Sequence, residues 1–149
     1  TRKISRSVAL IKLNKQKYLE LGNLEAQRDW GYAPEYIEAM WLMLQQKKPK
    51  DYVIATGKMY TVRQFINESI KHFGFDTYWT GKDENEKLKL KKNNKKIIKI
   101  NKKFYRPNEV EKLLGDASLT KKQLKWKPIV DFKNLVKIMS LSDLEIYNK

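Results

Sequence analysis

The feature that most constrains the fold is a strand-loop-helix pattern over residues 52–73. The compact apolar run Tyr52-Val53-Ile54-Ala55 predicts a buried strand, closed by Thr56-Gly57. Thr61 and Gln64 then have the spacing of a capping box, and apolar residues follow at helical spacing. A buried strand followed by an amphipathic helix is typical of α/β proteins, so we expect an α/β fold.

The rest of the chain alternates helices with short strands. Apolar periodicity and caps predict further helices over residues 4–14, 34–46 and 118–125, and one that begins after Asp131. Short strands are expected at residues 18–21 and 77–79, with a hairpin whose turn is Asn93-Asn94. No repeat or linker divides the chain, so we expect one α/β lobe over residues 1–149 with little sheet of its own.

One helical stripe is expected to face the core. Ile37, Met40, Trp41 and Leu44 follow the i, i+3, i+4, i+7 spacing after Pro34. Such a stripe predicts packing against the protein interior and not a cofactor site.

The charge of the chain points to an anionic partner. Lys and Arg total 32 against 17 Asp and Glu, a formal net charge of +15. Nine of the lysines and no acidic residue lie between Lys87 and Lys103, which predicts a Lys-rich hairpin rim. Nucleotide phosphates, nucleic acids and acidic lipids all fit this sign, and a solvated surface without a task fits it as well.

Several classes of site and location are excluded or not expected. The chain has no cysteine, which excludes disulfides and thiolate metal sites and favours a reducing compartment. The single histidine, His72, is expected as a packed or half-exposed helical residue, and no metal site is expected. No apolar run is long enough to span a membrane, so we expect a soluble cytoplasmic protein. Because the chain begins with Thr1 and not with Met, we expect further chain upstream.

Arg28 is the first candidate phosphate-binding residue. It lies in Gln27-Arg28-Asp29-Trp30-Gly31, shortly before the helix that Pro34 opens. A guanidinium near a helix N-terminus can bind phosphate oxygens bidentately while the helix amides also favour anions. The competing interpretation is a surface ion pair between Arg28 and Asp29, or a helix cap.

Arg106 and Glu109 form the second candidate. Arg106 precedes Pro107, which can open a helix and bring Glu109 to the same side. A cation binds phosphate, and a carboxylate accepts hydrogen bonds from ribose hydroxyls, so the pair suits a nucleotide. The competing interpretation is a plain helix-surface ion pair. If Arg28 and Arg106 meet in one cleft, they can hold a diphosphate from two sides.

Ordered blocks along the whole chain resemble one enzyme family. The blocks are Thr1-Arg2-Lys3-Ile4, Gly22 to Gly31, Glu38 to Gln46, Tyr52 to Gly57, Tyr105 to Val110, Leu114-Gly115-Asp116 and Leu124 to Pro128. In this order they resemble the C-terminal half of the GDP-mannose 4,6-dehydratases, which are extended short-chain dehydrogenases.

The resemblance implies a substrate-binding role. In this family an N-terminal Rossmann domain binds NADP, and the C-terminal lobe holds the GDP-sugar. Carried over by motif, Lys3 approaches the guanine or its neighbouring phosphate, Arg28 and Arg106 bind the diphosphate, and Glu109 accepts from the ribose hydroxyls. Arg2 is a weaker candidate. The family oxidises C4 of the sugar, removes water across C5 and C6, and returns the hydride to C6, which gives GDP-4-dehydro-6-deoxymannose.

The chain departs from the family at two positions and lacks the cofactor motif. Tyr32 stands where relatives often have His, and Leu88 where they often have Gly. The six glycines form no dinucleotide-binding fingerprint, and we expect the catalytic Tyr-x-x-x-Lys of the family to lie upstream of Thr1. The chain alone is therefore expected to bind substrate without turning it over. We expect a homo-oligomer in the complete enzyme.

Two alternatives stay open at this point. A lobe of a UDP- or dTDP-sugar epimerase or dehydratase would use Arg28 and Arg106 in the same way. A basic nucleic-acid-binding protein would use the Lys-rich hairpin with Tyr78, Trp79, Phe104 and Tyr105 as stacking groups. No helix-turn-helix, zinc or RNP motif is present, so we do not expect nucleic acid or a membrane as a partner.

Overall fold

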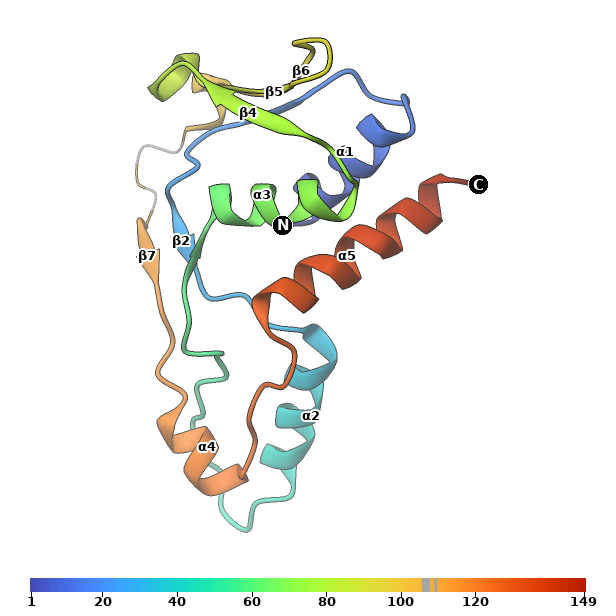
Figure 1. Ribbon diagram of the computed structural model, residues 1–149. Coiled ribbons are helices and arrows are strands. Elements are labelled where there is room, and N and C mark those ends of the chain that lie inside the picture. The colour runs from blue at the N-terminus through green and yellow to red at the C-terminus, as the bar shows by residue number, and fades with distance from the viewer. Residues whose placement is uncertain (106–107, 109) are drawn as a thin grey trace.

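A four-stranded sheet forms the upper layer of the molecule (Figure 1). The computed structural model describes residues 1–105, 108 and 110–149. The sheet has the order β1-β6-β5-β4, formed by β1 (Leu19–Leu21), β6 (Lys96–Ile100), β5 (Lys87–Leu90) and β4 (Thr77–Thr80). β1 runs parallel to β6, and the other two pairs are antiparallel. Two 3-10 turns, η1 (Asp83–Asn85) and η2 (Lys102–Phe104), lie close to the sheet.

Three helices pack beneath this sheet and form the main core with it. They are α1 (Arg2–Lys12), α3 (Val62–His72) and α5 (Phe132–Tyr147), which contact one another. Alternation along the strands places Leu88 and Ile98 in the core, where they face each other across β5 and β6. Lys87 and Lys99 are likewise opposite each other, on the outer face of the sheet.

A second, three-stranded sheet connects the upper and lower parts of the molecule. Its order is β3-β2-β7, with β2 (Gln27–Arg28) between β3 (Tyr60–Thr61) and β7 (Lys112–Leu113). β2 pairs antiparallel with β3 and parallel with β7. Arg28 therefore lies on the central strand, opposite Tyr60 on one side and Leu113 on the other.

The lower part includes α2 (Ala33–Leu44), α4 (Ser118–Leu124) and the segment 51–55, which forms neither helix nor strand (Figure 1). Its buried core is small and includes Ala39, Leu124 and Trp126. Glu35 in the first turn of α2 holds the segment after α4, because its backbone carbonyl accepts from Trp126 Nε1 at 2.9 Å. Its carboxylate also accepts from the backbone N–H groups of Ile129 and Val130.

Local sequence signals predicted most of these elements. The capping box is confirmed: Thr61 Oγ1 accepts from the Gln64 N–H at 3.0 Å, and Gln64 Oε1 accepts from the Thr61 N–H at 2.7 Å. The Asp131 cap, the hairpin and the strand at 77–79 are also confirmed. Within the described ranges, no helix is both long and apolar enough to cross a membrane.

Two predictions about the lower part are wrong. The α2 stripe does not face a core, since Ile37, Met40, Trp41 and Leu44 are 63%, 49%, 58% and 82% exposed. Residues 52–55 form no strand, because no described strand pairs with them. The helix α2 packs against α4 through other residues, including Ala39.

Candidate functional site

A cavity of about 480 Å³ lies where the two sheets meet the start of α1. Its walls come from the first turn of α1, the turn after β1, the central strand β2, the start of α3 and η2. The polar and aromatic lining includes Lys3, Asn23, Arg28, Trp30, Lys103 and Phe104. Three basic residues from separate segments thus border one cavity.

Lys3 reaches this cavity from the first turn of α1. Its Nζ lies 3.9 Å from the centroid of the Phe104 ring on η2, a cation–π contact. The contact keeps the ammonium group at the cavity wall. Phe104 was not among the residues predicted for phosphate or sugar binding, although it directly precedes the Tyr105 to Val110 motif.

Arg28 is placed by the strand pairing of β2. Its Nη1 donates to the Gln27 carbonyl at 2.7 Å and lies 3.4 Å from the carbonyl oxygen of Glu111. The neighbouring Asp29 bonds elsewhere: its carboxylate accepts from the Thr56 N–H and hydroxyl and from the Gly57 N–H. Asp29 is thus bonded to residues 56 and 57, and its pairing with Arg28 stays an untested alternative.

The helix that borders the cavity differs from the one expected. We predicted that Arg28 would lie at the N-terminus of α2, yet no residue lining the cavity belongs to α2. Lining residues at helix starts belong to α1 and α3, through Lys3 and Val62. Residues 29–32, which form neither helix nor strand, separate Arg28 from the first turn of α2.

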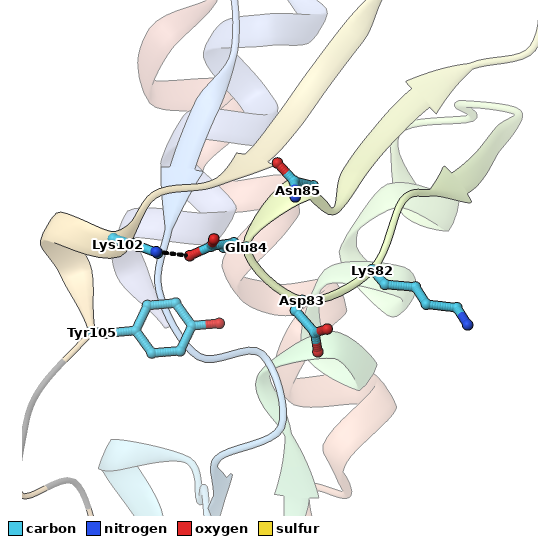
Figure 2. A pocket seen from close by; sticks show the side chains of 6 residues that line it. All are labelled: Lys82, Asp83, Glu84, Asn85, Lys102 and Tyr105. Carbon is cyan, nitrogen blue, oxygen red and sulfur yellow. Dashed lines mark ion pairs between the residues drawn. The ribbon is translucent and has the colours of Figure 1, made fainter.

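Arg106 and Glu109 lie outside the described residues. The described residues on either side reach the same region, since Tyr105 lines the cavity and the Glu111 carbonyl accepts from the Gln27 N–H at 2.7 Å. Figure 2 shows the Tyr105 ring beside the ion pair between Lys102 and Glu84, in a neighbouring pocket. The described residues on either side of Arg106 and Glu109 thus lie close to β2, the strand that carries Arg28.

Gly22 allows the turn after β1 to lie against η2. A Cβ atom at this position would lie 2.3 Å from the Phe104 carbonyl oxygen and 2.6 Å from its carbon. A side chain would push these two walls apart. No sequence pattern predicted this contact.

Arg2, the weaker candidate, points to a different partner. Its Nη2 lies 3.0 Å from Oδ1 of Asp143, a buried residue of α5 whose other oxygen accepts from Ser5 Oγ at 2.6 Å. Arg2 does not line the cavity. It instead ties the start of α1 to α5 and so supports the place of Lys3.

One Tyr-x-x-x-Lys spacing does occur within the chain, although a spacing alone does not identify the catalytic motif of the family. Tyr78 and Lys82 have this spacing. Tyr78 is on β4, with its hydroxyl bonded to Asn94 Oδ1 at 2.9 Å, while Lys82 borders two other pockets. The two residues do not line the cavity of Lys3 and Arg28, so the spacing here forms no part of that site. His72 lies half-buried on α3, as expected.

Comparisons of sequence identify the relatives of this chain. The family model described as GDP-mannose 4,6 dehydratase matches residues 1–139. GDP-mannose 4,6 dehydratase from Homo sapiens is 49% identical over 146 residues, which cover 98% of this chain and 39% of the human protein. GDP-mannose 4,6-dehydratase from Vibrio cholerae is 43% identical over 155 residues, which cover 97% of this chain and 42% of that protein. The chain thus spans about two fifths of the length of these curated relatives.

Solved structures share the fold at low identity. RMD from Pseudomonas aeruginosa complexed with NADPH has a TM-score of 0.76 at 16% identity and covers 97% of this chain and 42% of that one. UDP-glucose 4-epimerase from Thermotoga maritima with UDP-glucose has a TM-score of 0.68 at 19% identity and covers 98% and 39%. The fold is that of one portion of extended short-chain dehydrogenases, and the sequence matches show that the chain belongs to the GDP-mannose 4,6-dehydratase family.

Proposed function

We propose that this chain is the GDP-mannose-binding part of an enzyme that forms GDP-4-dehydro-6-deoxymannose. The main observation is that Lys3 and Arg28, predicted from separate motifs, border one cavity. Its volume of about 480 Å³ is in the range of small-ligand pockets, about 300 to 1,000 Å³. The alternative of a basic nucleic-acid-binding protein gains no support from the family match.

The four candidate residues bind different groups of the nucleotide. Arg28 and Arg106 bind the diphosphate, because a planar guanidinium can donate two parallel hydrogen bonds to phosphate. Lys3 binds the guanine or the neighbouring phosphate, and Glu109 accepts from the ribose hydroxyls. The positions of Tyr105 on the cavity and Glu111 beside β2 support the participation of the intervening segment.

The remaining chemistry belongs to a part that this chain does not include. We propose an N-terminal Rossmann half, which binds NADP and docks on the exposed stripe of α2; the exposure of Trp41 and Leu44 supports this. When bound there, NADP would supply the hydride acceptor and donor that the reaction needs. The glycines of this chain form no fingerprint for its diphosphate, so the 149 residues alone are inactive as a lyase. The complete enzyme is proposed as a cytoplasmic homo-oligomer, the absence of cysteine agreeing with a reducing compartment.

A comparison of two ligands tests the proposal. In the complete enzyme, made of this chain and the proposed N-terminal half, GDP-mannose should raise the thermal midpoint more than UDP-glucose does. Preferential stabilisation by UDP-glucose would instead favour the epimerase alternative, whose fold the chain also shares.

Substitution of the arginines tests the site itself. Arg28→Ala and Arg106→Ala should each weaken GDP-mannose binding by about 1.5 to 3 kcal/mol, the range for a hydrogen bond to a charged group. Lys92→Ala, in the exposed hairpin turn, provides a control with the same change of charge. An arginine variant that binds as tightly as Lys92→Ala would be removed from the site.

A further inference from the structure

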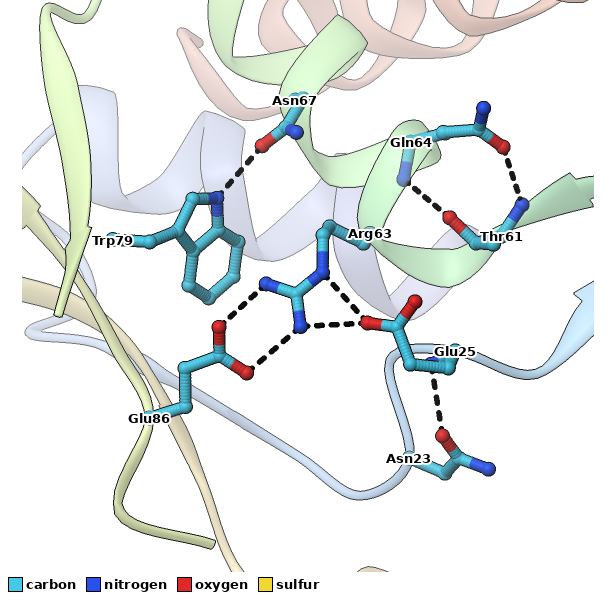
Figure 3. Close-up of polar contacts among 8 residues, drawn as sticks. All are labelled: Asn23, Glu25, Thr61, Arg63, Gln64, Asn67, Trp79 and Glu86. Atoms are coloured by element: carbon cyan, nitrogen blue, oxygen red, sulfur yellow. Dashed lines mark hydrogen bonds and ion pairs between the residues drawn. The ribbon is translucent and has the colours of Figure 1, made fainter. Parts of the chain in front are cut away.

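Arg63 does not line the cavity of Lys3 and Arg28, yet it joins the segments that form its walls. It lies in the first turn of α3, with its guanidinium between two carboxylates (Figure 3). Nη1 and Nη2 donate to the two oxygens of Glu86 at 2.6 and 2.8 Å. Nε and Nη2 lie 2.7 and 2.6 Å from Glu25 Oε1. Arg63 thus links Glu25 and Glu86, which lie 38 and 23 positions away from it along the chain.

The surroundings hold this guanidinium in one orientation. Its Cζ lies 4.7 Å from the centroid of the Trp79 ring, and Trp79 Nε1 donates to Asn67 Oδ1 at 3.0 Å (Figure 3). The side chains of Arg63 and Glu86 are 27% and 15% exposed, so water screens their pairing less than at the open surface. The bonds to Glu86 and then Glu25 raise the pKa of Arg63, which stays charged.

The first wall held by Arg63 is the segment that leads to Arg28. Besides the Glu25 contact, the Arg63 N–H donates to the Leu24 carbonyl at 2.9 Å, and the Val62 N–H donates to the Ala26 carbonyl at 3.2 Å. Residues 24–26 are therefore bonded to the start of α3 through both backbone and side chain. The next two residues form β2, so this anchoring fixes the position of the Arg28 backbone and hence the point from which its side chain extends.

The second wall is reached through Glu86. Its carbonyl accepts from the Ile100 N–H at 3.1 Å, and the next residue, Asn101, donates its N–H to the Leu21 carbonyl at 2.8 Å. These bonds place η2, with Phe104, against the turn at Gly22. Both walls of the cavity therefore depend on segments that meet at the Arg63 guanidinium.

We propose that Arg63 is a positioning residue for nucleotide-sugar binding. It acts through Glu25 and Glu86 by fixing the spacing between the wall of Arg28 and the wall of Phe104, and it does not touch the ligand. The inference rests on the proposed function, because it assigns to this cavity the GDP part of GDP-mannose. A residue of purely structural importance would change stability and leave affinity for the ligand as it was.

The test compares binding and turnover in the complete enzyme. Arg63→Ala should raise the Kd for GDP-mannose, measured by calorimetry, by about tenfold or more, since small displacements of binding groups have large effects. KM should rise while kcat changes much less, because the reacting groups lie elsewhere. Arg63→Lys keeps the charge without the planar fork and should have an intermediate effect.

Two further variants keep the test decisive. Glu25→Gln removes the charge of a partner of Arg63 whose side chain is 63% exposed. This variant should fold and should also raise the Kd for GDP-mannose. Lys71→Ala is the matched control: it removes a cation from the same helix, paired with Glu68 at 3.1 Å, and should leave Kd unchanged.

The outcomes separate this inference from the proposed function. If the parent enzyme does not bind GDP-mannose, the proposed function is wrong and the inference falls with it. If the parent binds and Arg63→Ala folds with an unchanged Kd, only the positioning role is overturned. If Arg63→Ala fails to fold, Glu25→Gln decides: a raised Kd supports the role, and an unchanged Kd overturns it. An equal rise of Kd in Lys71→Ala would also overturn it.

Discussion

The upper and lower parts of the molecule use apolar residues in different ways. In the upper part, the apolar faces of α3 and α5 are covered by other elements, so Phe65 and Val136 are fully buried. In the lower part, α2 buries little more than Ala39 and leaves Trp41 and Leu44 exposed. A soluble chain seldom exposes a continuous apolar stripe of this kind unless another surface covers it. The difference teaches that the upper part covers its own apolar faces, and it supports the proposal that another surface covers α2.

The largest expected effect tests the upper core. Phe65→Ala should lower the free energy of unfolding by about 3 to 5 kcal/mol, because it leaves a cavity at a position that is 0% exposed. Leu44→Ala, at a position 82% exposed, should change it by less than about 0.5 kcal/mol. Urea unfolding of the two variants measures both values. Equal losses would remove the contrast between the two parts.

The next prediction concerns the partner of the lower part. Trp41→Ala should weaken association with the proposed N-terminal half by about 2 kcal/mol or more, since exposed Trp residues are often central to interfaces. Calorimetric titration of separately produced halves measures this. Leu141→Ala, at an exposed apolar position on α5, is the control and should leave association unchanged. If both variants associate like the parent, α2 is not the docking surface.

Asp29 links the strand of Arg28 to the lower part, and its removal should have a moderate effect. Its carboxylate accepts hydrogen bonds from Thr56 and Gly57, at 2.6 to 3.0 Å. Asp29→Ala should lower the free energy of unfolding by about 1 to 3 kcal/mol, because these donors lose their acceptor. Asp29→Asn keeps one oxygen acceptor and should cost less. Chemical denaturation measures the loss of unfolding free energy in both variants. A larger loss in Asp29→Asn than in Asp29→Ala would contradict this role.

The smallest effect is expected at a surface ion pair of the upper sheet. The hydrogen bond from Lys99 lowers the pKa of Glu20 below its ordinary value of 4.5. A lowered pKa in the folded state means that the pair stabilises the fold at pH values above the ordinary pKa of Glu20. This contribution is lost as the pH falls through the pKa of the folded state. The difference in unfolding free energy between the parent and Glu20→Gln should therefore be larger at pH 7 than at pH 3. A difference that does not shrink at acid pH would contradict the pairing.

Local signals explain which elements were predictable. A capping box at Thr61 and Gln64 and a cap at Asp131 act over three residues, so the sequence alone specifies them. The hairpin between β5 and β6 is also short-range, since few residues separate its strands. The parallel pairing of β2 with β7 joins residues 85 positions apart, and no local pattern indicates it.

The candidate site was predictable in part for the same reason. The Arg28 motif could be recognised from its residues and from the family resemblance, and the structure places this side chain on one cavity with Lys3. The roles of Lys3, Arg28, Arg106 and Glu109 stay predictions until ligand binding is measured. The contact of Phe104 with Lys3 and the Arg63 linkage had no sequence signal, because each depends on groups brought together from separate segments.

The sequence by itself determined the helices, their caps, the hairpin and the family. Tertiary structure alone decided which apolar faces are buried: the spacing of Ile37, Met40, Trp41 and Leu44 specifies a helical face but not what covers it. The run at 52–55 likewise has the composition of a buried strand and finds no pairing partner among the described residues. Periodicity is a property of one segment, whereas burial and pairing require a second surface, and only the folded arrangement shows where that surface is present.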